Sequence, residues 1–169
     1  MKPSKNFTTN NFHIREFLRS DIAESRGQDG KMKYPEMYKA QQNPSEEVLL
    51  NLEALIIEIM QPLRVLMGSA IYISSGYRCL ELNRKVGSKD TSQHIVGEAC
   101  DFSLDSNWKT KEAYNEIRKG FNFHQVIYYP QRNFVHVSFK RHGRNKKQAL
   151  VFFEGHYICL LYTSDAADE

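Results

Sequence analysis

Two histidines and one aspartate are the residues whose types and spacing favour metal chemistry. His94 and Asp101 lie seven residues apart in "SQHIVGEACDF", and His136 lies in the middle of "NFVHVSF". Because residues two apart share a face of a strand, Asp101 points to the same side as the small residues Ala99 and Gly97. A turn at Gly97 could swing the imidazole of His94 over that cleared surface. Two imidazoles and a carboxylate suit Zn²⁺, and a catalytic zinc keeps a fourth position for water.

The same residues also have an explanation without metal. A half-buried histidine bonded to an aspartate accounts for His94 and Asp101, and a metal site requires His136 to converge on them in space. The spacing alone leaves both explanations open. The remaining histidines lack this setting and are expected to be surface or hydrogen-bonded polar residues. The three cysteines form no CxxC pair, so neither a disulfide framework nor a cysteine zinc site is indicated.

The elements that position these residues follow from apolar spacing. Helices are expected over residues 13–25, 43–68, 80–86 and 110–120, the second starting at Asn43 and Pro44 and kinked by Pro62. Strands are expected over residues 70–78, 97–104, 124–129, 133–139 and 148–155. The order of these elements predicts an α+β fold, with helices packed on one face of a mostly antiparallel sheet.

Composition limits the functional classes. The 169 residues are 41% hydrophobic and 25% charged, which fits one compact domain. The net charge of +3 gives little support to nucleic-acid binding, and the basic run "KRHGRNKK" (residues 140–147) is interpreted as a solvated turn. No apolar run is long enough for a membrane span, and the start lacks the apolar centre of a secretory signal. We therefore expect a monomer made in the cytoplasm, with no nucleic-acid or membrane partner.

The last eleven residues, "CLLYTSDAADE", are expected to be foreign to the fold. They resemble the in-frame translation of an adapter used in sequencing libraries, and such segments are excluded from fold reasoning. A natural polar tail is the alternative. The expected domain therefore covers residues 1–158, with residues 159–169 as a non-native tail.

Several short motifs together resemble the zinc D-Ala-D-Ala carboxypeptidase family. These motifs are "SGYR" (residues 75–78), "LN" (residues 82–83), "SQHIVGEACDF" and "FVHVSF", preceded by "NFHIREFLRSDIA" near the start. That family includes peptidoglycan carboxypeptidases and phage endolysins, and it shares its fold with the Hedgehog signalling domain. The resemblance therefore implies a Hedgehog/DD-peptidase-like fold.

The resemblance also implies roles for five residues. His94, Asp101 and His136 would be the ligands of Zn²⁺. Arg78 would bind the carboxylate of a substrate or the developing oxyanion, a task suited to a fixed and always charged guanidinium. A structural salt bridge is the alternative for Arg78. Ser92 would hydrogen-bond the substrate or cap the turn before His94.

The sequence offers no clear candidate for the general base. Relatives commonly carry an acid at the position of Asn133 or at that of Tyr129, and the amide of Asn133 cannot serve as a base. Glu98 is expected to point away from Asp101. His124 is the remaining titratable candidate on a neighbouring strand.

Three functions remain open on this basis. The first is a zinc peptidase that cuts peptide bonds of peptidoglycan, as a D-Ala-D-Ala carboxypeptidase or as an endolysin-type endopeptidase. Such an enzyme, of bacterial or bacteriophage origin, would act on the cell wall after release from the cell. The second is a zinc-binding but catalytically weak or inactive cell-wall binding module, and the third is a metal-free structural protein.

Overall fold

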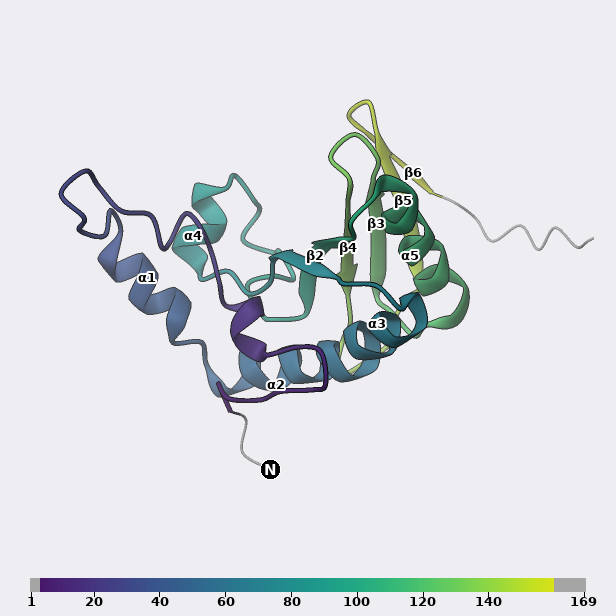
Figure 1. Cartoon of the computed structure of the whole chain (residues 1–169), viewed down its shortest axis with the longest axis horizontal. Helices are drawn as coiled ribbons and strands as arrows, with labels where there is room; N and C mark the ends of the chain where they lie inside the picture. Colours follow the sequence, from purple (N-terminus) through teal and green to yellow (C-terminus); the bar gives the residue numbers. More distant parts are fainter. Residues whose placement is uncertain (1–3, 160–169) are drawn as a thin grey trace, which may run out of the picture.

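A six-stranded mixed sheet forms the centre of this computed structural model, which describes residues 4–159 (Figure 1). The order of the strands is β1-β2-β4-β3-β5-β6, and only the β3–β5 pair is parallel. The strands are β1 (Tyr72–Ser75), β2 (Ala99–Ser103), β3 (Gln125–Tyr129), β4 (Phe134–Ser138), β5 (Gln148–Phe153) and β6 (His156–Cys159). The predicted α+β fold with a mostly antiparallel sheet is confirmed.

One long helical segment and one separate helix cover a single face of the sheet. The long segment joins α2 (Glu46–Leu55), the π-helical turn η2 (Ile56–Met60) and α3 (Gln61–Met67), and the separate helix is α5 (Asn107–Gly120). Figure 1 shows α2 and α3 along one side of the sheet and α5 beside β3 and β5. Three shorter elements, η1 (Ile14–Phe17), α1 (Pro35–Gln42) and α4 (Leu80–Lys85), lie nearer the β1 edge.

Strand alternation separates an apolar face of the sheet from a polar one. Cys100 and Phe102 of β2, with Val135 and Val137 of β4, are buried in the core beneath the helices. The residues between them therefore point to the face that these helices leave uncovered. Asp101 is one of these residues, and it faces the opposite way from Cys100, as the sequence predicted.

The first helix is much shorter than the expected span of residues 13–25. Only Ile14–Phe17 forms a 3₁₀ helix, which begins with reciprocal capping by His13 and Glu16. The reason lies in tertiary hydrogen bonds: the carbonyl of Phe17 accepts from the backbone N–H of Tyr77 at 2.7 Å, and that of Leu18 accepts from Gln41 at 2.9 Å. Carbonyls engaged in this way do not continue an α-helix.

The second helix also differs from expectation at its start. Its N-cap is Ser45, whose hydroxyl accepts from the backbone N–H of Val48, so Asn43 and Pro44 precede the helix. A π turn, η2, lies shortly before Pro62, which lacks an N–H to continue the helical ladder. Gly68 ends the segment in the left-handed conformation, as predicted.

Two elements, α1 and β6, had no counterpart in the predicted set. Cys159 ends β6, and residues 160–169 of the expected tail lie outside the described residues. Within residues 4–159, no helix combines the length and the apolar character needed to cross a bilayer.

Candidate metal centre

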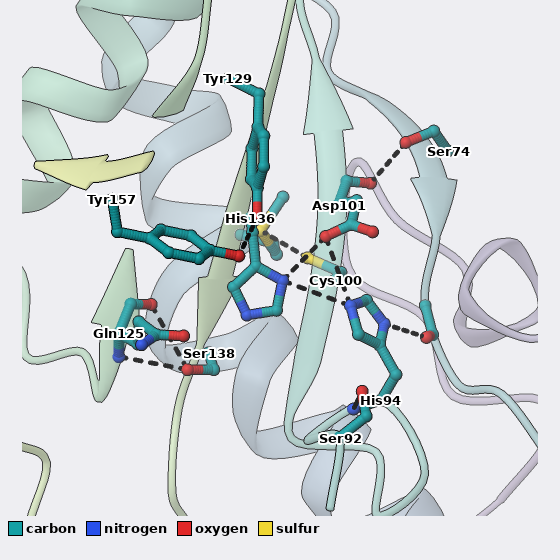
Figure 2. A network of polar contacts seen from close by, with 12 residues as sticks. Ser74, Ser92, His94, Cys100, Asp101, Gln125, Tyr129, His136, Ser138 and Tyr157 are labelled. Carbon is teal, nitrogen blue, oxygen red and sulfur yellow. Dashed lines mark hydrogen bonds and ion pairs between the residues drawn. The ribbon is translucent and has the colours of Figure 1, made fainter. Parts of the chain in front are cut away.

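His94, Asp101 and His136 bring one ligand atom each to a common point (Figure 2). His136 Nδ1 lies 2.8 Å from Asp101 Oδ1, His94 Nε2 lies 3.3 Å from the same oxygen, and the two nitrogens are 3.2 Å apart. Two nitrogens and a carboxylate oxygen gathered this closely form a donor set that suits a divalent cation such as Zn²⁺. His136, whose position relative to the other two residues the sequence spacing left open, is therefore part of the cluster.

The register of the sheet places Asp101 and His136 together. They are directly paired across the antiparallel β2 and β4 strands, so both side chains project from the same face. The hydroxyl of Ser74 donates to the backbone carbonyl of Asp101 at 3.1 Å, where β1 has an irregular register. This contact fixes the edge of the sheet beside the cluster.

A tight turn delivers His94 to the same face. Gly97 has a φ of 73°, and a Cβ there would lie 2.7 Å from the backbone oxygen of Val48. The buried Asn51 of α2 donates to the carbonyl of Val96 at 2.9 Å and holds the turn against the helix. The turn that the sequence predicted at Gly97 is confirmed.

A backbone carbonyl of the "SGYR" segment sets the orientation of the His94 ring. His94 Nδ1 donates to the carbonyl of Gly76 at 2.6 Å, which leaves Nε2 with its lone pair directed at the cluster. A Cβ on Gly76 would lie 2.3 Å from the backbone oxygen of Phe17. Only glycine therefore allows η1 and the "SGYR" segment to approach this closely.

Charge and burial in the cluster also suit a metal ligand set. Burial raises the pKa of Asp101, but attraction to His94 and hydrogen bonds from His136 and His94 outweigh it and hold that pKa far below its usual value. Burial lowers the pKa of His94, although Asp101 opposes this shift. A neutral imidazole and an ionised carboxylate are the forms that bind metals.

The cluster lies in a cleft of about 570 Å³. Its walls come from the loop 87–93 on one side and from β3, β4 and β6 on the other. This volume falls within the range of about 300–1,000 Å³ that is typical of small-molecule sites. The cluster is therefore reachable by a ligand.

Comparison with known proteins identifies the family. A family model described as Peptidase M15 matches residues 11–138, which contain all three cluster residues. The chain belongs to the Peptidase M15 family. The resemblance to the zinc D-Ala-D-Ala carboxypeptidase family is thereby confirmed, and M15 peptidases are metallopeptidases.

Three curated relatives are named peptidoglycan L,D-endopeptidase MepK. They come from Escherichia coli strains K12, O6:H1 and O157:H7. Each is 25% identical to this chain over an alignment of 142 residues, and the match covers 77% of this chain and 74% of the relative.

Arg78 lines the cleft of this M15 peptidase, and its backbone is held on both sides. The backbone N–H of Arg78 donates to the carbonyl of His94 at 3.1 Å. The buried Gln41 donates to the carbonyl of Tyr77 and accepts from the backbone N–H of Cys79. Among the described residues the buried Nε of Arg78 has no hydrogen-bond partner, so this donor is unsatisfied in the structure. No salt bridge in the described part of the chain includes Arg78.

Ser92 both lines the cleft and supports the turn that carries His94. Its hydroxyl accepts from the backbone N–H of His94 at a long 3.4 Å. The hydroxyl therefore retains capacity for another partner.

His124 does not line this cleft. It borders a different pocket together with Glu98 and Lys140, and this placement gives no support to His124 as the general base. Glu98 lines that pocket and not the cleft, which agrees with the expectation that it points away from Asp101. Asp101 is the only acidic residue that lines the M15 cleft within residues 4–159, so the described residues offer no free carboxylate base.

Sequence reasoning missed two buried amides, Gln41 and Asn51, that hold the loops carrying Arg78 and His94. No local signal marks Gln41, because it lies in a mostly polar segment. Asn51 could have been found, since it is a polar residue within the stripe of apolar residues on α2.

Proposed function

We propose that this M15 family member is a zinc-dependent peptidase that hydrolyses peptide bonds of peptidoglycan. The observation that carries the proposal is the convergence of His94, Asp101 and His136 at the base of an open cleft. The peptidoglycan substrate is supported by the names of the curated relatives. Both carboxypeptidase and endopeptidase action are compatible with this ligand set.

His94 Nε2, Asp101 Oδ1 and His136 Nδ1 would hold the zinc. The donor hydrogen bond from His94 Nδ1 to Gly76 fits this role, because it fixes the tautomer that presents Nε2. A bound Zn²⁺ supplies Lewis acidity toward water and toward the scissile carbonyl. The fold contributes a rigid arrangement of the three ligand atoms, since two of them lie on paired strands.

Arg78 would bind an anionic group of the substrate. It lines the cleft together with Lys89 and Arg132, whereas Asp101 is the single acid among the described lining residues. A cleft with this charge favours a peptide that carries a free carboxylate, and a guanidinium can bind a carboxylate in a bidentate manner. Ser92 would add a hydrogen bond to the same ligand.

A zinc-binding module with weak or no catalysis is the second candidate. It is favoured by Asn133, at a position where the family resemblance implies an acid, and by the lack of a second carboxylate among the described residues of the cleft. A missing general base typically costs about 10²–10⁴-fold in rate, so the chemistry would be slowed rather than abolished.

Digestion of purified peptidoglycan separates the two candidates. The protein is stripped with chelator, reloaded with zinc or left metal-free, and incubated with peptidoglycan and its soluble peptide fragments. We expect new fragments, identified by mass spectrometry, only with the zinc-loaded protein and not with the Asp101→Asn variant. Binding of the fragments without any cleavage would contradict the peptidase and support the binding module.

A further inference from the structure

A row of four aromatic side chains from four neighbouring strands borders the cleft, and three of them, Phe134, Tyr129 and Tyr157, line it. Phe134, Tyr129, Phe152 and Tyr157 come from β4, β3, β5 and β6. Successive ring centroids are 4.3, 5.3 and 4.8 Å apart. Strand pairing places these rings on the same face as His136, because Ile127 pairs with His136 and Tyr129 is two residues further along.

Two hydroxyl groups of this row face the cleft. The hydroxyls of Tyr129 and Tyr157 are 3.5 Å apart, and both residues line the cleft with His136. Figure 2 shows the two hydroxyls directed at each other on the His136 side of the site. Tyr157 lies outside residues 11–138, the part of the chain that the M15 family model matches.

The separation of the hydroxyls suits a shared partner better than a bond between them. Hydroxyl hydrogen bonds are usually about 2.7–2.8 Å long, so 3.5 Å leaves the two groups weakly engaged with each other. Two donors at this separation can both reach one acceptor oxygen at normal hydrogen-bond length. Burial and the neighbouring Tyr157 raise the pKa of Tyr129, so this phenol remains a donor at neutral pH.

We propose that Tyr129 and Tyr157 together donate hydrogen bonds to the carbonyl oxygen of the scissile peptide as it gains negative charge. This inference rests on the proposed peptidase function. Arg78 follows β1 and the tyrosines belong to β3 and β6, so the strand order places them on opposite sides of β2 and β4. In this arrangement the guanidinium of Arg78 binds the carboxylate of the substrate. The two tyrosines would stabilise the negative charge on this oxygen. They would do so in a cleft where Asp101 is the only carboxylate among the described residues.

Tyrosine-to-phenylalanine variants test this role, because they remove a hydroxyl and keep the packed ring. Tyr129→Phe and Tyr157→Phe are compared with wild type for kcat and KM on the peptidoglycan fragment that the wild type cleaves. Tyr128→Phe is the matched control, since Tyr128 lies on the same strand but packs against Tyr114 on the helical face. Zinc content and melting temperature are measured for every variant.

We expect each of the two variants to lower kcat about 10²-fold, as typical for loss of one oxyanion donor. KM, zinc content and melting temperature should stay close to wild type, and Tyr128→Phe should retain full kcat. A rise in KM at unchanged kcat, or no change at all, overturns the role. If the wild-type protein cleaves nothing, the proposed function fails and the role fails with it. If wild type cleaves and the variants match it, only the tyrosine role fails.

Discussion

Gln41 hydrogen-bonds the backbone on both sides of Arg78. Its amide nitrogen donates to the carbonyl of Tyr77 at 2.7 Å, and its amide oxygen accepts from the N–H of Cys79 at 2.8 Å. The same nitrogen also donates to Leu18, so one buried side chain joins α1, the segment after η1 and the "SGYR" turn. The direction of Arg78 thus depends on a residue 37 positions earlier in the chain.

Gln41→Ala should therefore lower both stability and activity. It leaves buried backbone groups without partners, and each such group costs about 1–3 kcal/mol. We expect a lower melting temperature and a higher KM, because Arg78 loses its fixed backbone. Gln42→Ala is the control: Gln42 makes one long bond of 3.4 Å to Leu18, and its loss should change little. Equal effects of the two substitutions would contradict this role of Gln41.

Metal content should depend on Asp101 and not on His124. Asp101→Asn removes the charge that gathers the two imidazoles, so we expect the purified variant to lose the zinc that wild type retains through gel filtration. His124→Gln should bind zinc and cleave substrate like wild type, because His124 lines a different pocket. Elemental analysis and the peptidoglycan assay measure both outcomes. Loss of activity in His124→Gln with zinc retained would restore His124 as the base.

Gly76→Ala should disturb the site through the backbone. The new Cβ would lie 2.3 Å from the Phe17 oxygen, so η1 or the "SGYR" turn must move. Overpacking of this kind typically costs about 1–3 kcal/mol, and here it also displaces the carbonyl that orients His94. We expect a lower melting temperature and weaker zinc retention. Gly120→Ala, with no heavy atom within 4 Å of the new Cβ, should be close to neutral in both measurements.

The metal-free protein should lose stability on acidification. The folded-state pKa of His94 lies below its ordinary 6.5, so the unfolded chain binds a proton more readily below that pH. The free energy of unfolding then falls as the pH drops from about 6.5 toward the lower folded-state pKa. Asp101, whose folded-state pKa is far below 3.8, adds a further loss once the pH falls below about 3.8.

Melting temperatures measured in chelator between pH 8 and pH 4 test this dependence. Wild type should become less stable as the pH falls, and His94→Gln should show a shallower slope between pH 6.5 and pH 5. Identical slopes for the two proteins would show that His94 does not carry the effect.

Much of the candidate site follows from local sequence. Alternation in β2 and β4 predicted that Asp101 and Cys100 face opposite ways, because side chains of a strand alternate whatever the strand packs against. The positive φ of Gly97 and the left-handed end at Gly68 were likewise signalled by the residue type. The predicted extent of the first helix was wrong. The carbonyls of Phe17 and Leu18 accept hydrogen bonds from groups that are distant in the sequence.

The sequence by itself determined which residues can bind a metal and that Asp101 and His136 lie on strands while His94 precedes one, because those properties depend on side-chain chemistry and on covalent neighbours. Only the tertiary structure decided that His94 meets the Asp101–His136 pair, that His124 lies in another pocket and that Tyr157 reaches the cleft. These outcomes depend on strand order and on buried amides such as Gln41 and Asn51. Their partners are tens of residues away, and no local periodicity records such contacts.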